Sequence, residues 1–259
     1  MEPLLEVKKL TKTFQKKGQE ELAAVDHVSF CLLPGETLGI VGESGSGKST
    51  VARMITGLLK PSEGEIYLGG RAITHLKSRE QRQVYRQLQM VFQSPAESFD
   101  PRRTLGDGVG ESLKNTGLSS KERKRRVEKL FMQCGLPADF AGRYPHEVSG
   151  GQCQRAAIAR ALAVEPRLLI CDEATSALDV TVQKQVLELL ASLKREWGLS
   201  YLFICHDLAL VQQFCDRVLV MAEGRIVEEG TPEQVILHPR EEYTGNLIRS
   251  AFTEYEARR

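Results

Sequence analysis

The residues that could do chemistry begin with a glycine-rich run, GESGSGKS, at Gly42–Ser49. Its spacing matches G-x-x-x-x-G-K-[ST], and it lies between an apolar run and a segment with helical periodicity, as a phosphate-binding loop must. Glycines let the backbone N–H groups converge, so we expect Lys48 to reach the β- and γ-phosphates of a nucleotide and Ser49 to ligate Mg²⁺. The alternative is a plain glycine-rich turn, which the strand and helix context disfavours. The residues expected around the phosphates are Gly42, Glu43, Ser44, Gly45, Ser46, Gly47, Lys48, Ser49 and Thr50.

An acidic pair, Asp172 and Glu173, follows the apolar run LLIC. Ligands of open α/β sheets bind at the ends of such strands. Asp172 is suited to hold Mg²⁺, usually through water, and Glu173 to act as the general base that takes a proton from the attacking water. The alternative is an ordinary acidic pair at a strand end, and the presence of the phosphate loop favours the catalytic interpretation.

A second glycine-containing run, VSGGQCQR, precedes the helical segment RAAIARALA. Ser149, Gly150 and Gly151 at the start of a helix would form another anion-binding cradle of backbone N–H groups. In the alternative interpretation, Ser149 is only a helix cap beside flexible glycines, worth about 1 kcal/mol of stability. Two phosphate cradles so far apart in one chain require an explanation.

The elements that must position these residues alternate along the chain. Short apolar runs such as LLEVKKL, TLGIVG, RLLICDE and SYLFICH predict strands, and VTVQKQVLELLASLKREWG and LALVQQFC predict helices. After the phosphate loop, Val51, Ile55, Leu58 and Leu59 would share one helical face. Alternation of this kind implies parallel strands joined by crossover helices. RVLVMAEGRIVEEG predicts a hairpin that turns at Glu223–Gly224.

Composition limits the class of protein. The 259 residues include 41% hydrophobic and 27% charged ones, which is typical of a globular protein. A net charge of +1 gives no long-range field for nucleic acid, so we expect no nucleic-acid partner. The six cysteines have no metal-ligand spacing and are interpreted as reduced, buried thiols. With neither a leader-like start nor an 18-residue apolar stretch, we expect a cytoplasmic protein that does not cross a bilayer.

Taken together, the motifs resemble the nucleotide-binding subunit of ATP-binding cassette (ABC) transporters over nearly the whole chain. The phosphate loop, the SGGQ run, LLICDE and SALD occur in the family's order, together with a glutamine after LQMVF and a histidine after YLFIC. In that family two subunits pack head to tail, and each ATP lies between the phosphate loop of one subunit and the SGGQ run of the other. The resemblance therefore explains the two cradles and implies ATP and Mg²⁺ as cofactors.

The resemblance also assigns roles to single residues. Phe14 resembles the aromatic residue that stacks on adenine, with a core phenylalanine as the alternative. Gln93 resembles the glutamine that senses Mg²⁺ and the attacking water, and otherwise is a polar strand end. His206 resembles the switch histidine at the γ-phosphate, and otherwise is a structural histidine. Asp179 resembles the cross-dimer loop residue, and Gln152 completes the SGGQ run with Ser149.

The fold implied is α/β, a P-loop NTPase (RecA-like) core with a mostly parallel sheet, an N-terminal antiparallel β subdomain and an inserted α-helical subdomain. We expect residues 1–93 and 166–259 to form the core and residues 94–165 the helical subdomain. Cys153, Cys171 and Cys205 replace residues that are more often polar, small or aliphatic in the family. We hypothesise that they make the protein sensitive to thiol reagents.

Two segments, SPAESFDPRRT and HPREEYTGNLI, are similar to ATPases of the oligopeptide, dipeptide and nickel import group. The implied partners are two membrane permease subunits, an external substrate-binding protein acting indirectly, and a second ATPase subunit, identical or a sister chain. Such a subunit is peripheral on the inner face of the cell membrane. A short tail without cysteine inclines the cargo towards nickel or a metal chelate rather than short peptides.

Two other functions compete with an importer ATPase. One is a soluble ABC-family ATPase acting on nucleic acid or ribosomes, which usually carries an extra module or a second cassette. The other is a regulatory subunit that binds nucleotide without turnover, against which Glu173 and His206 argue. The basic run at Lys121–Arg126 is interpreted as a solvated helix face rather than a membrane or nucleic-acid patch.

Overall fold

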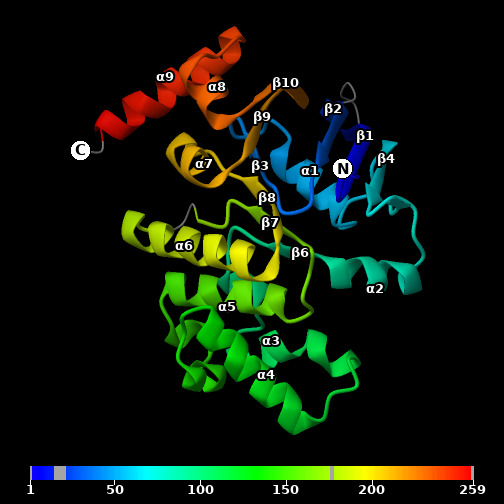
Figure 1. Ribbon diagram of the computed structural model, residues 1–259, viewed down its shortest axis with the longest axis vertical. Coiled ribbons are helices and arrows are strands. Elements are labelled where there is room, and N and C mark those ends of the chain that lie inside the picture. Colours follow the sequence, from blue (N-terminus) through cyan, green and yellow to red (C-terminus); the bar gives the residue numbers. More distant parts are fainter. Residues whose placement is uncertain (1, 15–21, 176–177, 258–259) are drawn as a thin grey trace. The chain divides into compact units, whose positions relative to one another are not determined.

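The computed structural model describes residues 2–14, 22–175 and 178–257. The chain divides into two compact units. Unit 1 comprises Met1–Val84 and Ser200–Arg259, and unit 2 comprises Tyr85–Leu199. Their elements are labelled in Figure 1.

Unit 1 contains an antiparallel sheet near the N-terminus. Its strands are ordered β2 (Leu22–Leu32), β1 (Leu5–Phe14), β4 (Glu63–Leu68) and β5 (Arg71–Ala72). The β1–β2 pair contains register shifts, and Lys9 and His27 adopt positive φ there. The antiparallel β subdomain expected from the family resemblance is therefore present.

The other strands of unit 1 carry the phosphate loop. They are ordered β10 (Arg225–Gly230), β9 (Arg217–Ala222), β3 (Thr37–Val41) and β8 (Ser200–Ile204). Strand β3 runs parallel to both β8 and β9, and every residue of β3 and β8 is buried. The predicted hairpin is confirmed: Glu223 and Gly224 have φ of +47° and +80°, the pair of left-handed residues that a tight hairpin turn requires.

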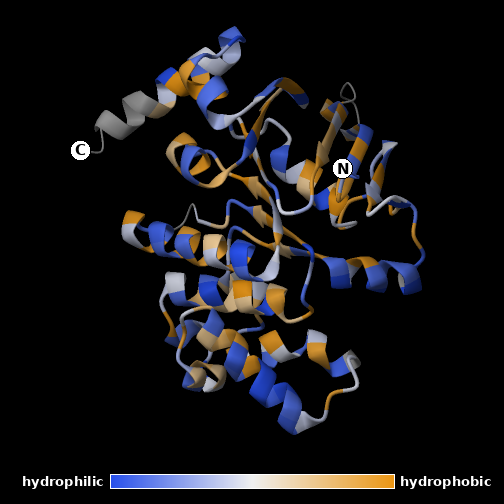
Figure 2. Ribbon diagram, viewed as in Figure 1, coloured by the Kyte–Doolittle hydropathy of each residue, from blue (hydrophilic) through white to orange (hydrophobic). Residues whose placement is uncertain are grey.

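Unit 1 also contains helices. They are α1 (Lys48–Ile55), α7 (Leu208–Phe214), α8 (Pro232–Leu237) and α9 (Glu242–Ala257), and α2 (Ser78–Gln87) leads into unit 2. Of these helices, α7 and α8 pack against the strands that carry the phosphate loop. One expectation was wrong: α1 ends at Ile55, because Gly57 turns the chain with φ of +73°, and Leu58 is 58% exposed rather than on a buried helical face. Figure 2 shows α2 mostly in hydrophilic colours and β9 in hydrophobic ones.

Unit 2 combines two parallel strands, β6 (Leu88–Val91) and β7 (Leu168–Asp172), with helices. Its α-helices are α3 (Leu105–Gly110), α4 (Ser120–Gln133), α5 (Gly150–Leu162) and α6 (Val180–Trp197). Single 3₁₀ turns join them: η1 (Ala96–Ser98), η2 (Ser112–Asn115), η3 (Ala138–Gly142) and η4 (Pro145–Glu147). Every regular element between residues 94 and 165 is helical.

Local sequence sets where the helices of unit 2 begin. Thr104, Ser119 and Ser149 precede α3, α4 and α5, and each accepts a hydrogen bond from the third residue of its helix in a capping box. On α4 the apolar side is buried, with Leu130 and Phe131 fully so, and each such side chain contributes about 1.5–3 kcal/mol. The α/β fold with parallel strands and a separate antiparallel sheet is therefore as predicted, and the expected boundaries at 93/94 and 165/166 remain a prediction.

Candidate nucleotide-binding and catalytic site

The phosphate loop connects β3 to α1. Gly42 and Gly47 have φ of +150° and +104°. A Cβ atom would lie 2.1 Å from the carbonyl oxygen of Met221 at position 42, and 2.4 Å from that of Ala24 at position 47. Both positions therefore require glycine, because backbone atoms fill the space that any side chain would occupy.

Lys48 lies inside the loop, with only 5% of its surface exposed. Its Nζ donates hydrogen bonds to the carbonyl oxygens of Gly42 at 2.8 Å and Glu43 at 2.7 Å, and contacts Oγ of Ser46 at 3.3 Å. These oxygens hold the ammonium group at the centre of the loop. Phosphate oxygens are stronger acceptors for a buried cation, so the loop fits a nucleotide's phosphate groups.

The start of α1 differs from that of most helices in this chain. Gly47 is its N-cap and supplies no side-chain acceptor for the first turn. Thr104, Ser119, Ser149 and Thr231 do supply one to their helices. The first turn of α1 therefore has no side-chain cap, as in phosphate-binding loops, where the positive end of the helix binds an anion.

The acidic pair lies where β7 ends, in unit 2. Asp172 is the last residue of β7 and is 6% exposed. Glu173 has φ of +49°, a left-handed conformation that costs a non-glycine residue about 1–3 kcal/mol and is typical of functional sites. Its Oε2 accepts a hydrogen bond of 2.8 Å from Nε2 of Gln93. Unit 2 therefore brings together two of the predicted catalytic residues, Gln93 and Glu173.

The SGGQ run is used structurally in this chain. Oγ of Ser149 accepts the N–H of Gln152 at 3.3 Å, and Oε1 of Gln152 accepts the N–H of Ser149 at 2.9 Å. Gly151 is required by packing, since a Cβ there would lie 2.4 Å from Cγ1 of Val182 on α6. At Gly150 the nearest atom to a Cβ would be 3.9 Å away, and both Ser149 and Gly150 are exposed. Ser149 is thus the N-cap of α5, and its role in an anion cradle remains a prediction.

Three other predicted residues lie at the ends of elements. Phe14 ends β1 and is 43% exposed, which excludes the core alternative, and Nζ of Lys12 lies 5.3 Å from the centre of its ring. His206 is exposed and precedes Asp207, the N-cap of α7. Asp179 caps α6, its Oδ1 accepting the N–H of Val182 at 3.0 Å. Ser176 and Ala177 of the SALD run lie outside the described residues.

Five of the six cysteines are buried, as interpreted from the sequence, and this burial opposes the hypothesis of sensitivity to thiol reagents. All six are free thiols, and Cys31 alone among them is partly exposed. Burial raises the pKa of Cys153 to about 11 and that of Cys171 to about 12, and Cys205 is 3% exposed. Because the thiolate is the reactive form, these buried thiols argue against the proposed sensitivity to thiol reagents.

One residue near the loop was missed. The N–H of Glu43 donates a 3.1 Å hydrogen bond to the hydroxyl of Tyr243, in the first turn of α9. In the sequence, HPREEYTGNLI carried only a resemblance to a transporter group and no sign of contact with the phosphate loop. A contact across 200 positions has no local signal.

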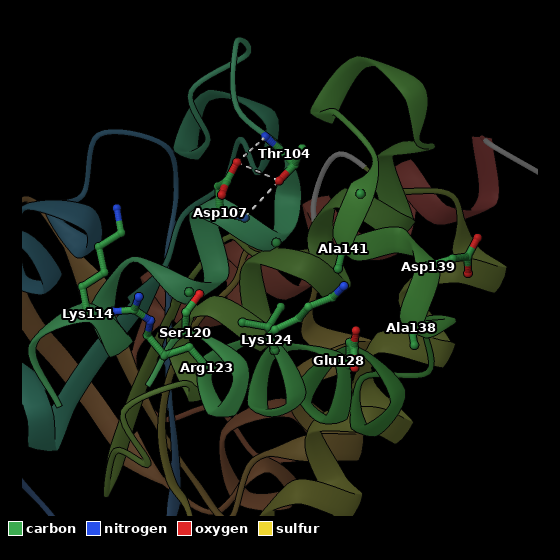
Figure 3. A pocket seen from close by; sticks show the side chains of 14 residues that line it. Thr104, Asp107, Lys114, Ser120, Arg123, Lys124, Glu128, Ala138, Asp139 and Ala141 are labelled. Carbon is green, nitrogen blue, oxygen red and sulfur yellow. Dashed lines mark hydrogen bonds between the residues drawn. The ribbon is translucent and has the colours of Figure 1, made fainter. Parts of the chain in front are cut away.

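A pocket of about 510 Å³ lies within unit 2, among α3, α4 and η3 (Figure 3). Its lining includes Thr104 and Asp107, which hydrogen-bond each other, and charged residues of α4. Lys124 reaches from α4 towards Ala141 (Figure 3). None of the residues predicted to bind nucleotide lines this pocket. Among the described residues, no helix is both long and apolar enough to span a membrane.

The loop, its buried lysine and the paired Gln93 and Glu173 define a nucleotide-hydrolysing protein of the P-loop class. The family model described as ABC transporter matches residues 25–176. The oligopeptide transport ATP-binding protein OppF of Salmonella typhimurium is 49% identical over 229 residues, covering 88% of this chain and 69% of that protein. OppF of Escherichia coli is 47% identical over 255 residues, covering 95% of this chain and 76% of that protein.

Another relative and a solved structure agree with these matches. A putative peptide import ATP-binding protein of Brucella ovis is 44% identical over 247 residues, covering 95% of this chain and 78% of that protein. The post-hydrolysis structure of the ATP-binding cassette MJ0796, a dimer bound to ADP and Pi, aligns with a TM-score of 0.81 at 32% identity. That alignment covers 88% of this chain and 98% of the other. The chain belongs to the ABC transporter family and is an ATP-binding ATPase of it.

Proposed function

We propose that this chain is the ATP-hydrolysing subunit of a peptide importer, coupling ATP binding and hydrolysis to uptake through separate membrane subunits. The proposal of a peptide cargo rests on the sequence identity of 44–49% between this chain and ATP-binding proteins of oligopeptide and peptide import. These relatives favour peptides over the nickel or metal chelate towards which the sequence inclined. The chain would work as a peripheral subunit on the inner face of the cell membrane, with an external binding protein delivering peptide to the permeases.

The proposed chemistry divides among few residues. Lys48 holds the β- and γ-phosphates, Phe14 stacks on adenine, and Glu173 takes a proton from the attacking water. Gln93 orients the Glu173 carboxylate through their hydrogen bond, and His206 positions the water at the γ-phosphate. The exposed Phe14 ring and the buried ammonium of Lys48 support these roles.

Magnesium would be held by oxygen donors: the Ser49 hydroxyl, the Gln93 amide oxygen and the Asp172 carboxylate. Within the described ranges, no cluster of three or more His, Cys, Asp or Glu side chains could hold a metal ion by itself. A donor set with one carboxylate fits Mg²⁺, which in ATPases takes its remaining ligands from phosphate and water. The ion would neutralise charge on the β- and γ-phosphate oxygens.

The active form would be a dimer, of two copies or of this chain with a sister subunit. The phosphate loop of one subunit would then face Ser149 and Gly150 of the other across each ATP, with Asp179 near the contact. The exposure of these three residues supports this arrangement, as does the dimeric ADP- and Pi-bound state of MJ0796.

The permease would dock on the pocket formed by α3, α4 and η3. Thr104, the last residue of the segment SPAESFDPRRT, lines this pocket, which also presents basic Arg123 and Lys124 and acidic Asp107 and Glu128. Lys124→Glu should reduce copurification with permeases at least several-fold while ATP binding is retained. Lys129→Glu is the control, because Lys129 is exposed on the same helix and outside the pocket.

The test of function is uptake in cells that lack this chain, complemented with wild type or Glu173→Gln, using a labelled oligopeptide and, separately, Ni²⁺. We expect wild type alone to restore peptide uptake. Restoration of Ni²⁺ uptake alone would overturn the cargo. If neither peptide uptake nor Ni²⁺ uptake is restored, and Glu173→Gln purified with ATP retains only soluble partners, the alternative function of a soluble ABC-family ATPase is favoured. No phosphate release above background by the wild-type protein would favour a subunit without its own turnover.

A further inference from the structure

Tyr243 joins the C-terminal helix α9 to the phosphate loop. The N–H of Glu43, the second residue of the loop, donates to the Tyr243 hydroxyl oxygen at 3.1 Å. Both residues belong to unit 1. Burial raises the pKa of Tyr243, so the hydroxyl stays protonated at neutral pH and acts as a neutral acceptor.

The residue that Tyr243 holds also contacts the central lysine. The carbonyl oxygen of Glu43 accepts Nζ of Lys48 at 2.7 Å and the N–H of Ser46 at 3.2 Å. The two peptide groups of Glu43 are therefore fixed on both sides, one by Tyr243 and the other by Lys48 and Ser46. One residue, Glu43, therefore links the Tyr243 hydroxyl to the Lys48 ammonium group in this chain of hydrogen bonds.

The position of Tyr243 is itself fixed by β10. Glu228 of β10 is 8% exposed, and its carboxylate oxygens accept the N–H groups of Arg240 at 2.9 Å and Glu241 at 3.3 Å, just before α9 begins. Next to Tyr243, Thr244 is 1% exposed, and Ile248 one turn later is 8% exposed. The start of α9 is therefore a rigid support rather than a loose tail.

We propose that Tyr243 is a positioning residue for ATP binding: its hydroxyl holds the Glu43 peptide group, and thereby Lys48, in the arrangement that accepts the phosphates. The inference rests on the proposed role of the phosphate loop. Without the hydroxyl, the loop is less ordered before nucleotide binds. Ordering it on binding costs free energy, which lowers the affinity for ATP and leaves Glu173 unaffected.

The test is Tyr243→Phe, which keeps the ring and removes one hydrogen bond. We expect the KM and Kd for ATP to rise about threefold to tenfold, the range that one neutral hydrogen bond supplies, with kcat within about twofold of wild type. Tyr67→Phe is the matched control: it also removes a hydrogen-bonded hydroxyl in unit 1, from Glu65, and should leave both constants unchanged. Unchanged KM and Kd in Tyr243→Phe would overturn the inference.

A second measurement does not depend on nucleotide binding. Amide hydrogen exchange of wild type without nucleotide should show the Glu43 N–H protected, and the same amide should exchange at least about tenfold faster in Tyr243→Phe. A Glu43 amide that exchanges as freely as an exposed one in wild type contradicts the inference. Lys48→Ala distinguishes failure of the Tyr243 inference from failure of the phosphate-loop assignment. If Lys48→Ala abolishes ATP binding while Tyr243→Phe binds ATP normally, only the Tyr243 inference fails. If Lys48→Ala binds normally, the phosphate-loop assignment fails with it.

Discussion

Nε2 of Gln93 donates a 2.8 Å hydrogen bond to Oε2 of Glu173, although the two residues are 80 positions apart. Strand register explains the contact. Val91 of β6 is paired with Cys171 of β7 in a parallel ladder, so the residues two positions beyond each leave the same edge side by side. The Gln93 amide and the Glu173 carboxylate therefore form one hydrogen-bonded pair, so a substitution of either residue also tests the role of the other.

Replacement of Glu173 by Gln should leave ATP binding intact and lower turnover about 10²- to 10⁴-fold, because a general base contributes that much. Gln93→Ala, which removes the donor but not the base, should lower turnover less. Phosphate release and nucleotide affinity, measured separately, check both. Turnover of Glu173→Gln at the wild-type rate would remove the base assignment.

Phe14→Ala should raise the KM for ATP about threefold to tenfold, because an aromatic stacking contact contributes about 0.5–1.5 kcal/mol. Leu22→Ala is the control, since Leu22 is paired with Phe14 across β1 and β2 and is also exposed, at 70%. Steady-state kinetics distinguish the two. If both variants shift the KM equally, the effect comes from the strand end and not from stacking.

The buried thiols predict resistance to alkylation. Burial raises the pKa of Cys134 and Cys171 to about 12 and that of Cys153 to about 11, so at pH 8 all three are protonated in the folded chain. We expect iodoacetamide to label Cys31 at most and to leave ATPase activity unchanged, as mass spectrometry and an activity assay would report. Labelling of Cys153 or Cys171 in active protein would contradict the burial.

The same thiols make stability depend on alkaline pH. In the unfolded chain they ionise near their ordinary pKa of 9.0, whereas the folded ones stay protonated up to about 11–12. Their contribution is complete below pH 9 and is lost as pH rises from 9 towards the folded values. Denaturant unfolding at pH 8 and pH 10 should show a smaller free energy of unfolding at pH 10, and a Cys171→Ala variant should show less of this loss.

Gly151→Ala should destabilise the chain by about 1–3 kcal/mol, because the new methyl group must displace Val182, 2.4 Å away. Gly150→Ala should keep the fold, since its Cβ meets only Leu178 at 3.9 Å, and it therefore tests the anion cradle alone. Thermal unfolding measures both variants. Adding Val182→Ala should restore much of the stability of Gly151→Ala, and failure to do so would point to a different cause.

Sequence predicted the parts of the fold whose signals are local. The phosphate loop, the hairpin at Glu223–Gly224 and the strands of the α/β core follow from spacing, turn residues and apolar runs. Helix α2 was not predicted, because SREQRQVYRQ is polar and Val84 is its buried apolar residue. Leu58 was misplaced because a single glycine ends α1 before the apolar pattern does.

The parts of the site that the sequence did not predict are contacts between residues that lie far apart along the chain. The contact of Gln93 with Glu173 requires the register of β6 and β7, and that of Tyr243 with Glu43 requires α9 to return to the loop. Neither leaves a periodic pattern in the sequence. The cysteines illustrate the reverse error, since Cys153 and Cys171 were expected to be reactive because they lie next to motifs, although α5 and β7 place them in the core.

The left-handed backbone of Glu173 has a consequence for heat resistance. Asparagine and glycine adopt that conformation more easily than glutamate, so replacing Glu173 by either should relieve local strain even as it removes the carboxylate. The inactive chain would then melt at a higher temperature than the active one. Thermal stability and turnover would then place opposite requirements on this one residue. Selection for thermal stability alone would tend to remove the catalytic activity.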